Sequence, residues 1–160
     1  MPTQTVIVPG EVEDRYIGVI HARDFQRYAV AVGDLNPIYF EDAAARQAGY
    51  RGIVAPPNFL TSVRNWGPGP FEGDLQRDGT EVENLPRELY GMRLMGGGHD
   101  LRFGRPVYPG DVVRARRRLI DFYTKTARFG ELSFAVYEIV YFADNGDELV
   151  TCRETIIAAQ

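Results

Sequence analysis

The sequence has one cysteine, no long hydrophobic run and no excess of positive charge. Cys152 by itself can form neither a disulfide within the chain nor a cysteine-based zinc site, which favours a reducing compartment. No segment approaches the roughly 20 apolar residues of a membrane-spanning helix, and residues 1–14 lack the basic start and apolar run of a secretory signal. We therefore expect a soluble, cytoplasmic protein that does not bind membranes.

The balance of charge excludes another class of partner. The chain has 18 basic and 22 acidic residues and a net charge of −4, so it lacks the broad basic surface that neutralises nucleic-acid phosphates. We expect no nucleic-acid partner. A length of 160 residues with 44% hydrophobic residues predicts a single domain, whose core is large enough to fold without metal or disulfides.

The first 66 or so residues are predicted to be rich in helices. Phe25, Tyr28, Ala29 and Val32 recur at helical spacing within residues 21–34, which predicts an amphipathic helix there. Two shorter helices are predicted at residues 41–49 and 56–67. The first of these starts acidic and ends in glycine, and the second has two prolines at its entrance, where helices tolerate proline.

The middle of the chain, at about residues 67–98, is rich in glycine, proline and charge and has no sustained period. We interpret it as an excursion inserted into the domain. Loops longer than about 12–15 residues are uncommon in compact domains unless they form lids or binding loops. The excursion is therefore either a cover for a ligand or a solvated connection between two elements.

From His99 onward the pattern predicts strands. They are expected at residues 111–125, 132–142 and 148–159, with a tight turn at 144–147. Residues 132–142 are apolar on both sides, so we expect a helix to cover one face of that strand and more protein, such as a second subunit, to cover the other. Helices first and an antiparallel meander afterwards predict an α+β domain with the helices packed on one face of the sheet.

Three segments carry a resemblance to a known family. They are residues 33–59 (GDLNPIYFEDAAARQAGYRGIVAPPNF), 96–111 (GGGHDLRFGRPVYPGD) and 145–157 (NGDELVTCRETII). Together they resemble the MaoC-like family of R-specific enoyl-CoA hydratases and 3-hydroxyacyl-thioester dehydratases, in the branch related to fungal fatty-acid-synthase dehydratase domains. The resemblance covers most of residues 1–160 apart from the excursion.

The resemblance implies a hotdog fold, in which an antiparallel sheet wraps around a central helix that would open at Pro56. It implies a homodimer, or a heterodimer with another MaoC-like subunit, whose sheets join edge to edge. The implied reaction is the syn addition of water to a 2-enoyl thioester or its reversal, in fatty-acid or polyketide metabolism. The implied substrate is a thioester of coenzyme A or acyl carrier protein, with no separate cofactor and no metal.

Family members use an aspartate and a histidine five residues apart, with an asparagine between them. Asp34 matches the aspartate and Asn36 matches the asparagine, whereas Tyr39 stands at the histidine position. An unperturbed tyrosine has a pKa of about 10 against about 6.5 for histidine, so it is a poor base near neutrality but can donate a hydrogen bond. Asp34 then acts through water, or the site is inactive; taken alone, this segment is also ordinary turn chemistry.

The resemblance also implies residues that bind the substrate. The backbone of Ala55, Pro56, Pro57 and Asn58, at the start of the central helix, would polarise the thioester carbonyl through free N–H groups and the helix dipole. Arg105 resembles a position near the thioester-bearing arm.

Histidine and arginine side chains supply further candidates. His99 is a better catalytic candidate than His21, because it follows three glycines where backbone can approach a ligand, although a histidine at a strand start is commonly a surface or packing residue. Arg114, Arg116 and Arg118 fall on one side of a strand. They form either a ridge for coenzyme A phosphates or an acyl carrier protein, or an ordinary solvated face.

Three functions compete. The preferred one is a hydro-lyase on 3-hydroxyacyl or 2-enoyl thioesters with Asp34 as acid/base. The second is a non-catalytic subunit that binds the acyl chain for a histidine-bearing partner. The third, a hotdog thioesterase, ranks last because it needs a carboxylate on the central helix and residues 56–67 contain no Asp or Glu.

Overall fold

A computed structural model describes residues 10, 12–63, 72–75, 86, 89, 91–128 and 130–159. The predicted excursion lies largely outside these residues. Within them the 3-10 helix η2 (Glu72–Asp74) is a short element of the excursion.

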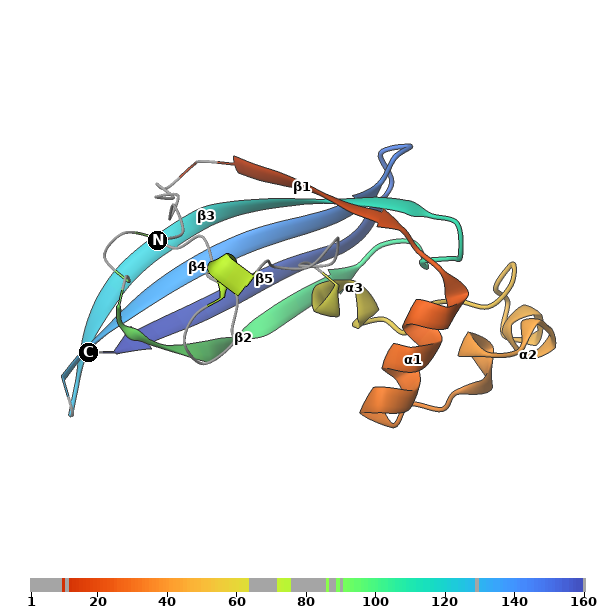
Figure 1. Ribbon diagram of the computed structural model, residues 1–160, viewed down its shortest axis with the longest axis horizontal. Helices are drawn as coiled ribbons and strands as arrows, with labels where there is room; N and C mark the ends of the chain where they lie inside the picture. Colours follow the sequence, from red (N-terminus) through yellow and green to blue (C-terminus); the bar gives the residue numbers. More distant parts are fainter. Residues whose placement is uncertain are drawn as a thin grey trace.

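Five antiparallel strands form one sheet in the order β1-β3-β4-β5-β2. The strands are β1 (Val12–Val19), β2 (Arg93–Phe103), β3 (Val112–Ala127), β4 (Gly130–Ala143) and β5 (Glu148–Ala159). Figure 1 shows β2 to β5 as long, curved ribbons side by side. The strands predicted at 111–125, 132–142 and 148–159 are thereby confirmed as β3, β4 and β5, joined as a meander.

The helices are α1 (Ala22–Val32), the 3-10 helix η1 (Pro37–Tyr39), α2 (Asp42–Gln47) and α3 (Phe59–Ser62). α1 and α2 gather at one end of the sheet, and α3 lies over the sheet itself (Figure 1). The predicted α+β class is confirmed. Among the described helices, none is long and apolar enough to cross a membrane.

The core forms where α3 lies on one face of the sheet, here called the inner face, and where α1 packs on α3. Phe59, Leu60 and Val63 are buried in the same cluster as Tyr137 and Ile139 of β4. The ring of Phe59 meets that of Phe25 edge to face, with centroids 6.1 Å apart. The apolar residues at the start of the predicted central helix are therefore packed into this core.

β1 was not predicted, because its pattern is inverted. Val12, Tyr16 and Val19 are exposed, whereas Glu13 and Arg15 lie on the more buried side and form an ion pair at 3.2 Å. Only Ile17 is an apolar side chain on the buried side, so the strand gives little signal of a half-buried face. The N-terminal part is thus a strand followed by helices.

β2 begins at Arg93, so residues 93–98 belong to a strand and not to the excursion. The register of β2 against β5 shifts between Gly96 and Gly98. A Cβ added at Gly97 would lie 2.8 Å from Thr155 Cγ2 and 3.0 Å from Ile157 Cγ1, closer than packed atoms approach. The glycines that resembled a flexible loop therefore allow a bulge to pack tightly on β5.

The outer face of β4 is half-buried within the sheet. Phe134 stacks on Tyr123 of β3 with ring centroids 4.9 Å apart, and the Lys125 ammonium lies 5.2 Å from the Tyr123 centroid. Cross-strand aromatic contacts of this kind shield apolar side chains without a second layer of protein.

Candidate functional site

Asp34 is presented by the end of α1. Gly33 adopts a left-handed conformation with φ of 76°, which favours glycine, and its N–H returns to the last turn of α1. The Asp34 N–H donates to the Ala29 carbonyl at 2.9 Å. This Schellman-type ending holds the Asp34 backbone against the helix and leaves its exposed side chain beyond the helix end.

Asn36 ties this turn together. Its side-chain Oδ1 accepts a hydrogen bond from the Ile38 N–H at 3.2 Å and so caps η1, in which Pro37 is the first residue. The Asn36 backbone N–H donates to Asp34 Oδ1 at 3.4 Å. Asn36 thus touches the carboxylate through its backbone, while its side chain is committed to the cap.

Tyr39 closes the turn from the inside. Its hydroxyl donates a hydrogen bond to Asp34 Oδ2 at 3.0 Å, and Gln26 Nε2 donates to the Tyr39 carbonyl at 3.1 Å. The Tyr39 residue is 5% exposed. Burial, followed by the hydrogen bond to Asp34 and the repulsion of its charge, raises the pKa of Tyr39 to about 12. Tyr39 therefore stays protonated near neutrality and acts as a donor to Asp34.

The predicted thioester-polarising backbone offers few donors. The Ala55 N–H donates to the Val107 carbonyl at 2.9 Å, and Pro56 and Pro57 have no N–H. Asn58 alone of the four has an N–H without a backbone acceptor among the described residues. The next N–H, of Phe59, donates to the Pro56 carbonyl at 3.0 Å. The Ala55 N–H is thus used in a backbone hydrogen bond of the fold.

Arg105 forms a clamp between two turns. Its Nη1 and Nη2 donate to the two oxygens of Asp111 at 2.8 and 3.1 Å, and its Nε donates to Asp147 Oδ2 at 2.8 Å. These acidic partners raise the pKa of Arg105. Hydrogen bonds from Asn145 and Arg105 lower the pKa of Asp147. Every nitrogen of the guanidinium is engaged within the chain, so the contacts that the structure shows are structural, and substrate binding by Arg105 stays a prediction.

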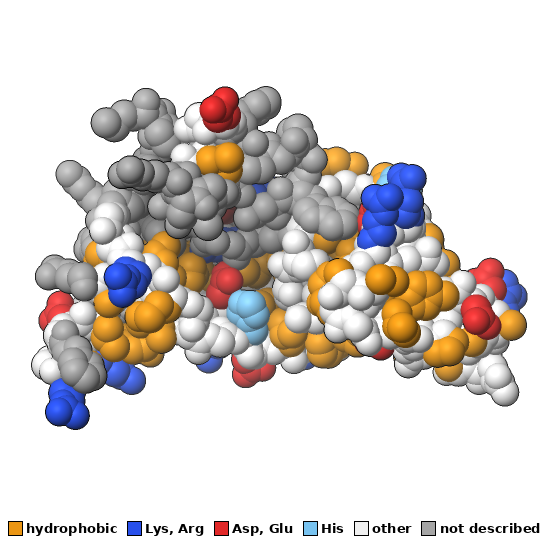
Figure 2. Space-filling view, turned by 60° about the horizontal axis from the view of Figure 1, so that its bottom comes forward, with side chains coloured by type: hydrophobic (Ala, Val, Ile, Leu, Met, Phe, Trp, Pro, Cys, Tyr) orange, Lys and Arg blue, Asp and Glu red, His pale blue; other side chains and the backbone are white. Residues whose placement is uncertain are grey.

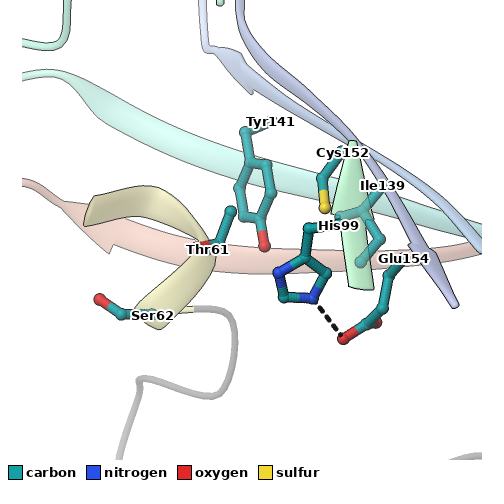
Figure 3. Close-up of a pocket in the computed structure, with 7 residues that line it drawn as sticks. All are labelled: Thr61, Ser62, His99, Ile139, Tyr141, Cys152 and Glu154. Atoms are coloured by element: carbon teal, nitrogen blue, oxygen red, sulfur yellow. Dashed lines mark hydrogen bonds and ion pairs between the residues drawn. The ribbon is translucent and has the colours of Figure 1, made fainter. Parts of the chain in front are cut away.

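His99 lies on β2, facing β5 rather than Asp34. Its Nε2 is 3.2 Å from Glu154 Oε1. The pair borders a cavity of about 110 Å³. The cavity is lined by Thr61, Ser62, His99, Ile139, Tyr141, Cys152 and Glu154. In Figure 3 the rings of Tyr141 and His99 point into the same space, while Ser62 turns away from it. No contact between His99 and Asp34 occurs in the described part of the chain.

The arginine ridge on β3 is neutralised. Arg114 pairs with Asp144 at 3.2 Å, Arg116 with Asp14 at 2.9 Å and Arg118 with Glu138 at 2.8 Å. All three arginine side chains are about half exposed. The ridge therefore has the arrangement of a solvated outer face laced with ion pairs.

Some polar residues of the interior were not anticipated. Arg117 points to the inner face, 7% exposed, with its guanidinium carbon 3.7 Å from the ring centroid of Tyr137 and its Nη1 3.9 Å from Glu13. The sequence does indicate this orientation, because successive side chains of a strand point to opposite faces, so Arg117 lies on the face opposite Arg116 and Arg118. Among the described residues, no group of three His, Cys, Asp or Glu is placed to hold a metal ion.

The sequence matches one protein family over almost its whole length. Residues 9–152 match the family described as the FAS1-like, dehydratase domain region. The chain belongs to this family. A UPF0336 protein from Thermobifida fusca (strain YX) is 30% identical over 96 residues, which make up 60% of this chain and 57% of that protein. The chain thus spans little more than half of that relative's length.

A shorter match is more nearly identical. The alpha subunit of a 3-oxo-4,17-pregnadiene-20-carboxyl-CoA hydratase from Mycobacterium tuberculosis is 74% identical over 30 residues, 19% of this chain and 10% of that protein. The identity is therefore concentrated in a small part of both chains.

Solved structures confirm the fold of this member of the dehydratase-region family. A chain of the ChsH1-ChsH2 complex from M. tuberculosis superposes with a TM-score of 0.71 and 25% identity, covering 91% of this chain and 86% of that one. A MaoC-like dehydratase from Rhodospirillum rubrum superposes with a TM-score of 0.68 and 14% identity, covering 96% and 94%. The resemblance to MaoC-like hotdog proteins inferred from sequence is confirmed.

Proposed function

We propose that this chain is one subunit of a hydratase or dehydratase that acts on 2-enoyl and 3-hydroxyacyl thioesters. In this proposal the chain contributes to binding of the acyl thioester, and a histidine-bearing hotdog subunit supplies the acid/base pair. The observation that carries the proposal is the hydrogen bond from the buried Tyr39 hydroxyl to Asp34. The geometry favours this role over the self-sufficient hydro-lyase preferred from the sequence.

The proton chemistry of hydration supports the proposal. Adding water across an enoyl thioester requires one group to accept a proton and another to deliver one near neutral pH. Tyr39, with a pKa of about 12, holds its proton throughout the neutral range. The Asp34 carboxylate accepts a hydrogen bond from the Tyr39 hydroxyl. The two side chains therefore bind each other, rather than acting as an acid and a base on a substrate.

Neither histidine of the chain takes the place of the missing catalytic histidine beside Asp34. His99 is held by Glu154 on the sheet, and His21 is an exposed residue at the start of α1. Neither contacts Asp34 among the described residues. A histidine for the reaction therefore has to come from outside these 160 residues, and we propose that a partner subunit supplies it.

Two relatives support a two-chain enzyme. One is named as an alpha subunit of a hydratase, and the solved structure with 25% identity is a complex of two different chains. The sheet of this protein ends in β1 and β2, each paired on one side only in the described structure. We propose that a hotdog partner, identical or different, joins one of these edges.

The test is hydration of a medium-chain enoyl-CoA by the purified chain alone and together with any hotdog subunit that copurifies. We expect no turnover by the chain alone, turnover by the complex, and measurable turnover by Tyr39→His alone. Tyr39→Phe is the matched control, since it alters the same ring without adding a base.

One result would show that this chain catalyses the reaction by itself. If the chain alone hydrates the enoyl-CoA and Asp34→Asn lowers the rate by about 10²–10⁴, the range for loss of a general acid or base, Asp34 is the catalytic group and the subunit proposal is wrong.

A further inference from the structure

Several arginines of the sheet and its turns each hold a carboxylate, as Arg105 holds Asp111 and Arg118 holds Glu138. Arg23 and Arg27 of α1 are exposed and have no carboxylate partner among the described residues. An anionic ligand gains most from cations whose charge is not already neutralised.

These two arginines border a groove. Arg23, Gln26, Arg27 and Val30 share the outward side of α1 at spacings of three, four and seven residues. With Phe40, which follows η1, they line a hollow of about 280 Å³. Val30 is 60% exposed although it is apolar. Figure 2 shows hydrophobic side chains gathered over the end of the molecule formed by α1 and α2, beside basic ones.

The groove lies beside the backbone of the Asp34–Tyr39 turn. Gln26 lines the groove and donates to the Tyr39 carbonyl, and Phe40 is the next residue in the chain. The Tyr39 hydroxyl in turn contacts Asp34. From Arg23 to Val30 the helix rises about 10 Å, so the cations and the apolar floor are laid out along a line rather than at one point.

On the basis of the proposed function, we propose that this groove binds the phosphopantetheine arm that carries the acyl group. The phosphate lies between Arg23 and Arg27, whose planar guanidinium groups match its oxygens. The dimethyl carbon of the arm packs on Val30 and Phe40, and the thioester end points toward the Tyr39 turn. This arm is common to coenzyme A and to acyl carrier protein.

The chemistry of the arm fits the groove at both ends. The arm has a dianion at one end, a branched apolar carbon next to it and amides beyond. The groove has two neighbouring exposed cations and an apolar floor. Binding would remove the apolar surfaces of both the arm and the groove from water. The ridge on β3 offers no such combination, because its cations are already paired with Asp144, Asp14 and Glu138.

The test compares two ligands that differ only in the phosphate. Saturated acyl thioethers of pantetheine 4′-phosphate and of pantetheine are titrated calorimetrically into the protein as purified, with any copurifying subunit. We expect the double variant Arg23→Gln/Arg27→Gln to bind the phosphorylated ligand about tenfold more weakly or worse, as for loss of charge-assisted contacts, and the unphosphorylated ligand unchanged. The matched control Arg114→Gln/Arg116→Gln removes the same charge and should bind both ligands like the wild type.

The outcomes separate the groove from the function. If the wild type binds the phosphorylated ligand and the α1 double variant binds it equally well, the groove proposal is wrong and the proposed function stands. If the wild type binds neither ligand, both are overturned. If a subunit covers α1 and blocks the ligand without competing for the acyl site, the groove is a protein interface and the proposal is wrong.

The source of the arm is resolved by a second pair of titrations. The same variants are tested with the acyl thioether of coenzyme A and with one attached to acyl carrier protein. A loss of affinity confined to one of the two assigns the groove to that carrier, and a loss in both assigns it to the shared arm; either supports the proposal. Unchanged affinity for both overturns it.

Discussion

The molecule contains two pairs in which a carboxylate meets a ring, and they differ in almost every property. Asp34 and Tyr39 meet at 3.0 Å across a tight turn, with Tyr39 5% exposed. Glu154 and His99 meet at 3.2 Å across two strands, with the His99 side chain 45% exposed. The first pair is built by neighbours in the sequence and the second by residues 55 positions apart.

The difference separates two requirements of acid/base catalysis. A catalytic ring must change its charge near neutral pH and must also be held firmly against the reacting atoms. Tyr39 is held firmly but keeps its proton near neutral pH, whereas the His99 side chain is half exposed on the edge strand β2 and is held less firmly. Neither pair meets both requirements, which is why we place the acid/base pair in another subunit.

The largest expected effect is that of removing the Tyr39 ring. Tyr39→Ala should lower the free energy of unfolding by about 3–5 kcal/mol, as for other buried aromatic rings. Tyr39→Phe keeps the ring and loses only the hydrogen bond, which should cost about 1 kcal/mol. Denaturant unfolding of both variants measures the two terms. Equal losses would show that the hydroxyl, not the ring, holds the turn.

A smaller effect is expected in alkali. The pKa of Tyr39 is about 12 in the folded chain, against about 10 for an unfolded tyrosine, so between these pH values the folded state holds a proton that the unfolded state has released. This contribution is complete below about pH 10 and is lost as the pH rises toward 12, by about 2 kcal/mol. The unfolding free energy of wild type minus that of Tyr39→Phe, measured across this window, isolates it. A flat difference would contradict the raised pKa.

The smallest effect is expected at the second pair. His99→Gln should change the free energy of unfolding by less than about 0.5 kcal/mol, because a half-exposed side-chain contact contributes little. The hydration rate of the assembled enzyme should change by less than about threefold, whereas loss of a general acid or base costs about 10²–10⁴. Glu154→Gln serves as the companion variant. A rate loss in the larger range for both would make this pair the catalytic one.

The elements that sequence predicted correctly have a strong internal period. α1 repeats its apolar residues at helical spacing, and β4 is a continuous run of strand-forming residues. β1 was not predicted because Glu13 and Arg15 lie on its more buried side, and the start of β2 was not predicted because glycines occupy its bulge. In both edge strands tertiary packing overrides the local pattern.

The same division holds for the candidate site. Asp34, Asn36 and Tyr39 were found because six consecutive residues fold into one turn, so their proximity is local. The partners of Arg105 and His99 depend on strand register and distant turns, which a single sequence does not reveal. That Arg23 and Arg27 lack carboxylate partners of the kind that Arg105 and Arg118 have emerges only from the structure.

The burial of Cys152 has a practical consequence. The chain has one cysteine, and that cysteine is 1% exposed in β5 beneath the cavity next to His99. Thiol reagents attack exposed thiolates much faster than buried thiols. A cysteine introduced on the outward side of α1 would therefore carry a fluorescent or spin label selectively, without replacement of the native residue. Distances between such labels in an assembled enzyme would report directly which edge of the sheet its subunits share.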